Sequence, residues 1–544
     1  MSDLAYSHGT SVTPLLGETI GDNLRRVSAS QPDADCVVSC QQGIRMSYGE
    51  FDRAVDDLTA GLIDAGFAVG DRVGIWSPNR VEWTLLQYAA ARCGVVLVTI
   101  NPAYRTSELE YVVRQSGCRM VVAVSSFKEG DYRAMLDEVR TSTPSLERVV
   151  FFDSPEWEAL ASAGRRLGHD AVQQRAAGLG CDDPINIQYT SGTTGFPKGA
   201  TLTHHNILNN GYFVGQRCGY TAADRVCIPV PFYHCFGMVM GNLGSTTHGA
   251  CMVIPAEAFD PHATLQAVQE ERCTSLYGVP TMFIAELAHK DFEGFDLSSL
   301  RTGIMAGSPC PVEVMKQVLS RMHMGEVTIC YGMTETSPVS TQTTADDTID
   351  QRVGTVGPVH PHVEVKIVDP GTGRTVARGE AGELCTRGYS VMLGYWNDPE
   401  RTDEAIDTAG WMHTGDLATM DVDGYVSIVG RSKDMIIRGG ENVYPREIEE
   451  FLFRHPAVAD VQVVGIPDAR YGEEIAAFVR LKDGQSVEVE GIRDFCRGRI
   501  AHYKVPRYVF FVDDFPMTVT GKIQKYKMRE TEIEERGLAE PETA

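Results

Sequence analysis

The stretch GEFDRAVDDLTAGLIDAGFAVGDRVGIWSPNR, residues 49–80, is the most informative segment for the fold. Its apolar residues recur with the period of one helix face. They are Phe51, Ala54, Val55, Leu58 and Leu62. Gly66 ends this pattern, and the apolar run RVGIW follows it as a short buried strand. We therefore expect a helix that leads directly into a strand of a covered sheet.

The same step repeats in the residues that follow. The sequence predicts a helix over 81–94 and a strand over 95–100, then a helix over 107–117 and a strand over 119–124. A second alternating run extends over 204–279. Helices that alternate with apolar strands are typical of a parallel sheet covered by helices, so the chain is predicted to be an α/β protein.

The pattern changes twice in the last third of the chain. Short β-rich pieces with glycine turns occupy about 352–430, and a new helix begins at Pro445, followed by alternating strands. A charged stretch flanked by glycines separates the β-rich region from the region that begins with this helix. We place a domain boundary at Lys433/Asp434, which gives domains 1–433 and 434–544; the alternative is a plain hairpin connection.

Composition limits the function classes. The 544 residues include 43% hydrophobic and 22% charged residues, as in ordinary globular proteins of more than one domain. A net charge of −24 argues against nucleic acid or an anionic membrane as a general partner, because both bind basic surfaces. Neither a signal, a transit peptide nor a membrane-spanning stretch is visible, so we expect a cytoplasmic protein without stable membrane insertion. The 14 cysteines include no C-x-x-C pair, which favours buried free thiols over a metal site.

The segment YTSGTTGFPKGA, residues 189–200, differs from the Walker phosphate loop. Pro197 stands where that pattern has its second glycine, and Gly199 follows Lys198 in place of a hydroxyl residue. Glycines, hydroxyls and a lysine are nevertheless suited to binding a polyphosphate. The alternative is a solvated loop. The residues predicted to bind phosphate are Thr190, Ser191, Gly192, Thr193, Thr194, Gly195 and Lys198.

This motif and its successors resemble the adenylate-forming superfamily of acyl-CoA synthetases, luciferases and peptide-synthetase adenylation domains. The resemblance covers nearly the whole chain and is greatest to the medium-chain fatty-acyl-CoA ligase branch. It implies a large N-terminal domain with two α/β sheet subdomains and a small β-barrel-like subdomain. A small mobile α+β C-terminal domain, carrying the catalytic lysine, would follow.

Two further segments resemble the family's nucleotide site. In YGMTET, 331–336, the resemblance implies adenine contact by Tyr331, a hydroxyl of Thr334 at the α-phosphate and a Mg²⁺ ligand in Glu335. The resemblance also assigns Gly332 and Met333 to this ATP-binding segment. In MAGSPC, 305–310, the resemblance implies close backbone approach to adenine at Gly307 and Ser308. A lone T-E-T would otherwise be a helix cap.

The C-terminal motifs complete the resemblance. Asp416 would accept both ribose hydroxyls and Arg431 would reach the same sugar or a phosphate, although a turn-capping aspartate is the alternative for Asp416. Lys433 corresponds to the family's hinge residue. In PMTVTGKIQK, 516–525, Lys522 corresponds to the essential lysine, which stabilises charge as the carboxylate attacks the α-phosphorus.

The segment RGGENVYP, 438–445, implies a second step in the same site. In the family, glycines corresponding to Gly439 and Gly440 let a strand approach the CoA pantetheine after the small domain has rotated. An acyl-adenylate forms first with loss of pyrophosphate, and the CoA thiol then attacks the activated carbonyl and releases AMP.

The sequence determines the identity of the acid substrate less well than the nucleotide site. In PFYHCFGM, 231–238, His234 lies where the family has an aromatic residue or histidine near the substrate carboxylate, although a buried structural histidine is an equal alternative. Acetate-specialised relatives carry a tryptophan at the position of Gly332, so the glycine implies an open acyl channel. The segments 211–215 and 277–287 are candidate apolar walls, or simply core.

The predicted function is ATP-dependent activation of a medium- to long-chain fatty acid and its transfer to CoA, with Mg²⁺ as cofactor. Two alternatives share the first half-reaction: luciferase-like oxygenation of the adenylate, and transfer of an aryl or fatty acyl group to a separate carrier protein. The expected partner is a small carboxylic acid and not nucleic acid. A homodimer, and a lysine acetyltransferase that acts on Lys522, are left open.

Overall fold

The computed structural model describes most of the chain. It covers residues 3–190, 197–308, 310–431, 434–438, 441–468, 470–517 and 523–538, without the side chains of Arg431, Glu441 and Asn442. The chain forms two compact units. The large unit comprises Ser7–Val365 and Cys385–His413, and the C-terminal unit comprises Met1–Tyr6, Lys366–Leu384 and Thr414–Ala544. Each is described by itself.

The first sheet of the large unit has the strand order β21-β11-β10-β5-β4-β6-β9 among the described residues. Its strands are β4 (Arg72–Trp76), β5 (Val96–Thr99), β6 (Met120–Ala123), β9 (Arg148–Phe151), β10 (Pro184–Thr190), β11 (Lys198–Thr203) and β21 (Gly394–Tyr395). The strands from β10 to β9 run parallel, whereas β11 is antiparallel to both β10 and β21. The parallel part confirms the predicted α/β alternation.

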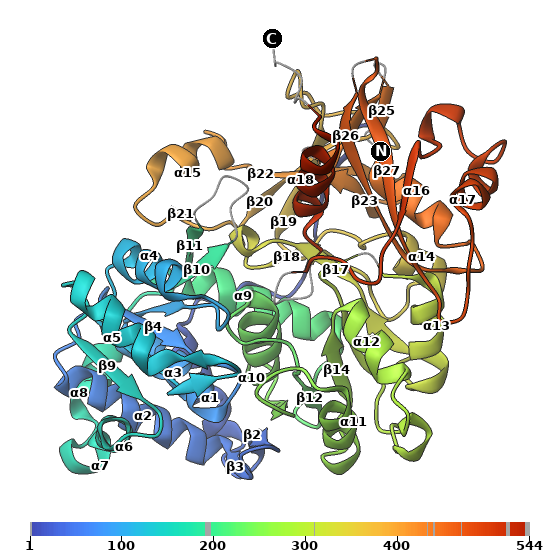
Figure 1. The fold of residues 1–544 in the computed structure, drawn as a ribbon. Coiled ribbons are helices and arrows are strands. Elements are labelled where there is room, and N and C mark those ends of the chain that lie inside the picture. Colours follow the sequence, from blue (N-terminus) through green and yellow to red (C-terminus); the bar gives the residue numbers. More distant parts are fainter. Residues whose placement is uncertain are drawn as a thin grey trace. The chain divides into compact units, whose positions relative to one another are not determined.

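Helices surround this sheet, as Figure 1 shows. They are α2 (Tyr48–Asp64), α3 (Val81–Cys93), α4 (Thr106–Ser116), α5 (Tyr132–Ser142), α6 (Pro155–Ala161), α7 (Ala163–Leu167) and α8 (Asp170–Ala176). Ser47 begins α2 with a complete capping box, in which Glu50 returns the hydrogen bond. Gly94 ends α3 in the left-handed conformation at φ 72°, which glycine adopts without strain. Local signals thus set the helix ends that the sequence analysis predicts.

The second sheet of the large unit has the order β16-β15-β14-β12-β13-β2-β3 within the described ranges. Its strands are β2 (Asp35–Ser39), β3 (Ile44–Ser47), β12 (Arg225–Cys227), β13 (Cys251–Ile254), β14 (Ser275–Gly278), β15 (Thr302–Met305) and β16 (Glu326–Thr328). Only β3 is antiparallel to its neighbour. The accompanying helices are α1 (Ile20–Ser30), α9 (His204–Arg217), α10 (Gly244–Thr246), α11 (Pro261–Glu270), α12 (Pro280–Leu287) and α13 (Val312–Arg321).

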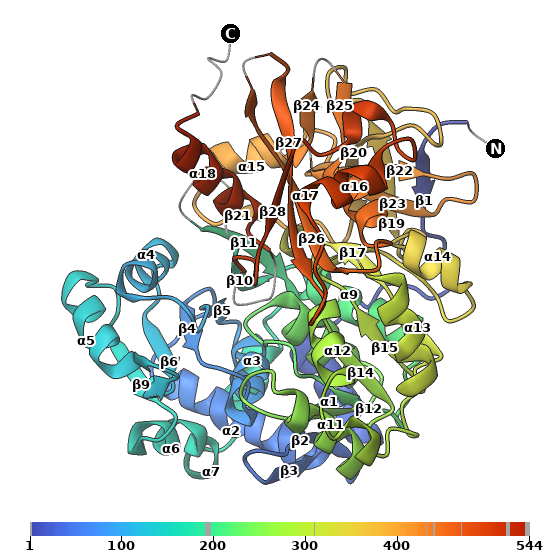
Figure 2. The same cartoon turned by 45° about the vertical axis from the view of Figure 1, so that its right-hand side comes forward.

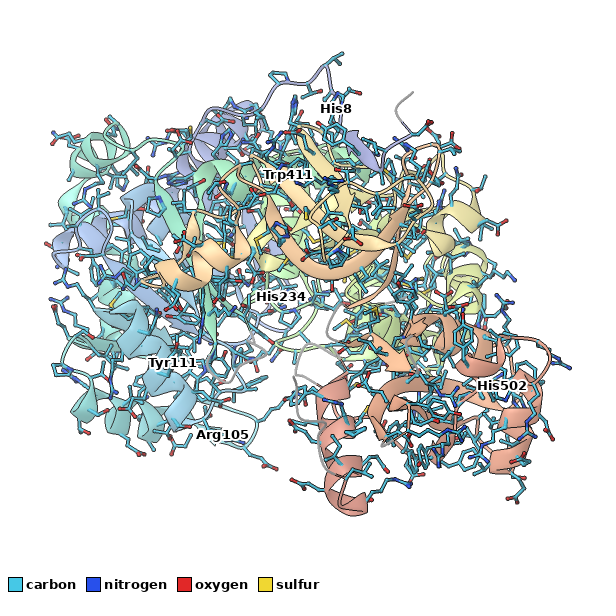
Figure 3. All side chains as sticks on the ribbon, turned by 90° about the horizontal axis from the view of Figure 1, so that it is seen from above. His8, Arg105, Tyr111, His234, Trp411 and His502 are labelled. Atoms are coloured by element: carbon cyan, nitrogen blue, oxygen red, sulfur yellow. The ribbon has the colours of Figure 1, made fainter. Side chains whose placement is uncertain are left out.

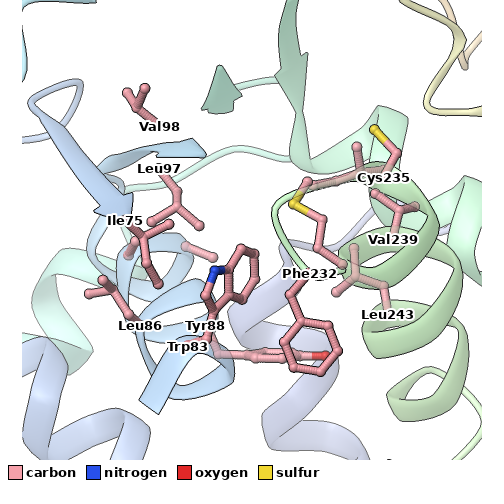
Figure 4. Close-up of a cluster of buried hydrophobic side chains, with 14 of the residues drawn as sticks. Ile75, Trp83, Leu86, Tyr88, Leu97, Val98, Phe232, Cys235, Val239 and Leu243 are labelled. Carbon is pink, nitrogen blue, oxygen red and sulfur yellow. The ribbon is translucent and has the colours of Figure 1, made fainter. Parts of the chain in front are cut away.

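The two sheets meet through α3 and the π-helix η1 (Phe236–Leu243). Figure 4 shows Trp83 and Tyr88 of α3 facing Phe232 and Leu243, and the rings of Trp83 and Phe232 lie 5.5 Å apart. Hydrogen bonds reinforce this apolar contact, since Gln87 Nε2 donates to the carbonyl of Met238 at 3.1 Å. One continuous core therefore joins both sheets of the large unit.

The C-terminal unit contains a sheet in which antiparallel pairs predominate. Its sheet has the order β25-β24-β27-β26, with β28 beside β27, and three α-helices accompany it in the described part. Figure 2 labels α16, α17 and β24–β28. The bounds are β24 (Ile436–Arg438), β25 (Glu441–Val443), α16 (Pro445–Leu452), β26 (Val458–Asp468), β27 (Gly472–Leu481), α17 (Val489–Cys496), β28 (Tyr508–Phe511) and α18 (Lys525–Arg536).

Five further strands form a sheet of order β1-β19-β20-β22-β23 among the described residues. Its strands are β1 (Tyr6–His8), β19 (Val363–Val368), β20 (Gly382–Gly388), β22 (Met412–Met420) and β23 (Val426–Arg431). Further elements are β17 (Cys330–Gly332), η3 (Thr334–Thr336), β18 (Val339–Gln342), α14 (Ile349–Gly354) and α15 (Pro399–Ala405). The expected boundary at Lys433/Asp434 stays a prediction, because Lys433 lies outside the described residues.

Candidate active site

The antiparallel pair β10–β11 holds both ends of the predicted phosphate loop. Thr190 and Lys198 are direct partners across this ladder, and Thr190 Oγ1 lies 3.5 Å from the carbonyl oxygen of Lys198. Both residues are half-buried. The other predicted phosphate-binding residues lie outside the described ranges; they are Ser191, Gly192, Thr193, Thr194 and Gly195.

Glu335 lies beside this pair on the short helix η3. Its carboxylate is buried, with 5% of the residue exposed. Oε1 accepts a hydrogen bond of 2.8 Å from the hydroxyl of Tyr395, and Thr190 Oγ1 lies 3.5 Å from the same oxygen. The backbone N–H of Met392 donates to the Glu335 carbonyl at 2.9 Å. Two segments that are distant in the sequence, around Thr190 and around Tyr395, therefore converge on the Glu335 carboxylate.

Tyr395 connects the carboxylate to the predicted phosphate-binding lysine. The Nζ atom of Lys198 lies 4.8 Å from the centroid of the Tyr395 ring, and Tyr395 is paired with Ala200 in the sheet. Burial, and then the charge of Glu335, raise the pKa of Tyr395 well above its usual range. The hydroxyl therefore stays protonated and donates to Glu335 at physiological pH. The sequence analysis missed Tyr395, and no local motif distinguishes it.

The donor set around Glu335 consists of oxygen atoms. A buried carboxylate flanked by two hydroxyl groups fits a hard cation such as Mg²⁺, which proteins hold through one or two carboxylates together with substrate phosphates. Lys198 adds a positive charge over the ring of Tyr395. This arrangement can bind a metal–polyphosphate complex.

The hairpin β17–β18 carries the other predicted adenine and α-phosphate contacts. Tyr331 pairs with Thr341, and Thr334 is buried at the start of η3. Gly332 approaches the backbone so closely that a Cβ atom built on it would lie 1.7 Å from the carbonyl oxygen of Pro338. A side chain at this position requires the hairpin to shift, so the backbone contact accounts for the glycine independently of an acyl channel.

Gly307 and Ser308 follow β15 at the carboxyl edge of the second sheet, and both are exposed. Gly307 has φ +96°, a conformation that side chains with a Cβ rarely adopt. The N–H of the preceding residue, Ala306, donates to the carbonyl of Gly278 on the neighbouring strand at 3.2 Å. Ligands of open parallel sheets bind at this edge, which supports the predicted role of the two residues.

His234 lies two residues before the π-helix η1 and is labelled in Figure 3. Its carbonyl accepts from the N–H groups of Gly237 and Met238, at 3.0 and 3.1 Å, and its Nδ1 lies 3.3 Å from the N–H of Phe236. The side chain is half-buried. π-Helical turns are frequent at functional sites, and the helix start fixes the orientation of this imidazole.

In the C-terminal unit, Asp416 and Arg431 are direct partners in the ladder between β22 and β23. The N–H of Asp416 donates to Thr414 Oγ1 at 3.1 Å, and Asp416 is half-buried. The structure thus brings together the two residues predicted to contact ribose. Lys433, Gly439, Gly440 and Lys522 lie outside the described residues.

Comparison with known proteins identifies the family. The family model described as AMP-binding enzyme matches residues 24–396, and the model of its C-terminal domain matches 447–522. The chain is 49% identical to the acyl-CoA synthetase YngI of Bacillus subtilis (strain 168), over 96% of this chain and 98% of that protein. It is 47% identical to the mitochondrial medium-chain acyl-CoA ligase ACSF2 of Danio rerio, over 98% and 91% of the two chains.

A solved structure agrees with these relatives. ATP-bound MatB from Rhodopseudomonas palustris superposes with a TM-score of 0.81 at 30% identity, covering 94% of this chain and 98% of MatB. The two adjacent family matches account for most of the chain, and the relatives align over nearly their whole lengths. The chain therefore belongs to the AMP-binding enzyme family and is an acyl-CoA synthetase within it.

Proposed function

We propose that this enzyme converts a medium- to long-chain fatty acid to acyl-CoA, with ATP cleaved to AMP and pyrophosphate. The observation that carries the proposal is the cluster of Glu335, Tyr395, Lys198 and Thr190, which places a buried carboxylate and a lysine beside the phosphate-loop segment. The relatives named medium-chain acyl-CoA ligases support this acid class.

In the first half-reaction, the β- and γ-phosphates of ATP would bind between Lys198 and the 190–195 segment. Glu335 would hold Mg²⁺, which supplies positive charge to the phosphates when bound. Thr334 would donate to the α-phosphate. A carboxylate oxygen of the acid forms a bond to the α-phosphorus while the bond to pyrophosphate breaks, and Lys522 would stabilise the charge that develops on the phosphoryl oxygens.

The nucleoside would be held from several elements. Tyr331, Gly332 and Met333 would contact adenine from one segment, with Gly307 and Ser308 contacting it from another. Hydrogen bonds from the ribose hydroxyls would go to Asp416, with Arg431 beside it on the neighbouring strand; their cross-strand pairing supports a shared role.

In the second half-reaction, we propose that the domain 434–544 rotates about Lys433 and brings Gly439 and Gly440 to CoA. The thiol sulfur bonds to the acyl carbonyl carbon, the bond from that carbon to the adenylate oxygen breaks, and AMP leaves with the electron pair. The thiol proton passes to solvent. His234 would lie beside the reacting carboxyl group, and the position of His234 before η1 supports this assignment.

Location and assembly are also proposals. None of the helices in the described ranges is long and apolar enough to cross a membrane. We propose a cytoplasmic enzyme, although the vertebrate relatives are named mitochondrial, and cell fractionation tests this assignment. We also propose that the enzyme forms a homodimer and that a lysine acetyltransferase acetylates Lys522.

The test of the function is AMP release from ATP and Mg²⁺ with acetate, octanoate, palmitate or 4-coumarate, each with and without CoA. Turnover that peaks at octanoate or palmitate and requires CoA supports the proposal. Adenylate formation that is indifferent to CoA would instead favour a carrier protein or oxygen as the acceptor.

A further inference from the structure

In the described residues, the strand β24 lies between β25 and β27 in the C-terminal sheet. It pairs with β25 through Ile436, Ile437 and Arg438, but the described register with β27 consists of one pair, Arg438 with Gly472. Neighbouring β26 and β27 pair along nearly their whole lengths, from Val458 to Asp468 on β26. Among the described residues, the pair Arg438–Gly472 is therefore the backbone link between β24 and β27, while Ile436 and Val443 of the hairpin pack in the core of the unit.

Polar side chains of β27 also hold β24. The guanidinium of Arg438 donates to both carboxylate oxygens of Glu474 on β27, at 2.7 Å from Nε and 2.9 Å from Nη2. Its Nη1 donates to the carbonyl of Tyr503 at 2.9 Å. The neighbouring N–H of Ile437 donates to Glu473 Oε2 at 2.8 Å. Two consecutive carboxylates of β27 thus hold two consecutive residues of β24.

The ion pair lies out of solvent. Glu474 is 1% exposed and Arg438 is 13% exposed, so the pair is weakly screened and its geometry is fixed. Arg507 contributes a second cation at 3.5 Å from Glu474, and also pairs with Asp468 at 2.9 Å. The ring of Tyr471 lies 5.0 Å from the Arg438 guanidinium. A lysine could replace the charge of Arg438 but not its planar, bidentate contact.

We propose that the Arg438–Glu474 ion pair positions the β24–β25 hairpin for the thioester-forming half-reaction. Arg438 directly precedes Gly439 and Gly440, to which the proposed function assigns the CoA contact, and the inference rests on that assignment. Arg438 is a positioning residue: it acts through the hairpin that it anchors to β27. Adenylate formation, which does not use this hairpin, is independent of the pair.

The experiment separates the two half-reactions in Arg438→Met, Arg438→Lys and Glu474→Gln. ATP–pyrophosphate exchange with octanoate measures adenylate formation, and preformed octanoyl-AMP with CoA measures thioester formation. In Arg438→Met and Glu474→Gln, kcat/KM for CoA should fall about tenfold or more, which corresponds to the loss of a charged hydrogen bond. Exchange should stay within roughly twofold of the wild type. For Arg438→Lys, kcat/KM for CoA should lie between the values of Arg438→Met and the wild type.

A matched control removes an ion pair of the same unit that does not touch β24. Glu447→Gln breaks the 2.5 Å contact with Lys504, in which the Glu447 side chain is 50% exposed, and both half-reactions should be unchanged. Hydrogen exchange of 436–438 should become faster in Arg438→Met and Glu474→Gln but not in the control.

Each outcome has a distinct meaning. Equal loss of both half-reactions in Arg438→Met and Glu474→Gln, with lowered melting temperatures, would show a role in folding alone and overturn the inference. Unchanged CoA kinetics in both variants would overturn it too. A wild-type enzyme that forms adenylate but no octanoyl-CoA would instead refute the proposed function, and with it the assignment on which the inference rests.

Discussion

Replacing Tyr395 with phenylalanine tests the candidate active site most directly. The substitution removes the hydroxyl that donates to Glu335 Oε1 at 2.8 Å, and keeps the ring that contacts Lys198. Both partners are buried, with 8% of Tyr395 and 5% of Glu335 exposed, so solvent can replace the lost bond only in part. A hydrogen bond to a charged group contributes about 1.5–3 kcal/mol.

That range corresponds to a loss of roughly 10- to 150-fold in kcat/KM for adenylation, if the bond orients Glu335 for metal–ATP binding. We expect Tyr395→Phe to show this loss in ATP–pyrophosphate exchange with octanoate and to need more Mg²⁺ for half-maximal rate. Because the pKa of Tyr395 is raised, the loss should not depend on pH between about 6 and 9, a window far below the tyrosine titration.

The control is Tyr48→Phe, which removes another buried hydroxyl, one that donates to the carbonyl of Ala250 at 2.7 Å. Both variants lose a buried hydrogen bond, so both should melt at a lower temperature, but only Tyr395→Phe should lose adenylation. If the two variants kept the same kcat/KM and the same Mg²⁺ dependence, the assigned role of Glu335 would be wrong.

Four further results are expected. Lys522→Ala should abolish ATP–pyrophosphate exchange and leave thioester formation from preformed acyl-adenylate largely intact; equal loss of both would contradict a rotating C-terminal domain. Acetylation of Lys522 removes its charge and should inactivate adenylation, so fully active, quantitatively acetylated enzyme would disprove the idea. Gly332→Ala should lower the melting temperature or prevent folding, because its Cβ would lie 1.7 Å from the Pro338 carbonyl; an unchanged melting temperature would refute this. Finally, burial raises the pKa of Glu286 well above its usual range, and both its carboxylate oxygens lack a hydrogen-bond partner in the described structure. Below the pKa of Glu286 in the unfolded chain, about 4.3, the carboxyl is protonated in both states and the stability that the raised pKa contributes is fully present. This stability is lost as pH rises through the pKa of Glu286 in the folded protein, because the unfolded chain releases the proton first. The melting temperature of Glu286→Gln minus that of the wild type should therefore increase between about pH 5 and pH 8. A difference in melting temperature that is constant with pH would contradict the reasoning.

Much of the fold follows from local sequence patterns. The apolar run RVGIW is β4 residue for residue, and the helix predicted from Phe51 to Leu62 lies within α2. The helix predicted from Pro445 begins at that residue as α16. These elements are predictable because hydrophobic period, capping residues and proline act within a few positions along the chain.

The site was less predictable, because tertiary contacts assemble it. Tyr395 reaches Glu335 only because β21 adds to the edge of the first sheet, a pairing without a local signal. The glycine at 332 suggests an acyl channel by resemblance, whereas the structure shows a backbone contact that the sequence does not reveal. Likewise, nothing in the order of residues indicates that Arg438 and Glu474 are partners.

The register between Thr190 and Lys198 also has a consequence for the entropy of ligand binding. Bringing the two ends of a loop together costs conformational entropy, and here strand pairing meets that cost when the protein folds. The ends of the segment are then already together when a polyphosphate binds, and more of its contact energy remains as affinity. A nucleotide loop without a Walker sequence can thus be preorganised by the strands that carry it.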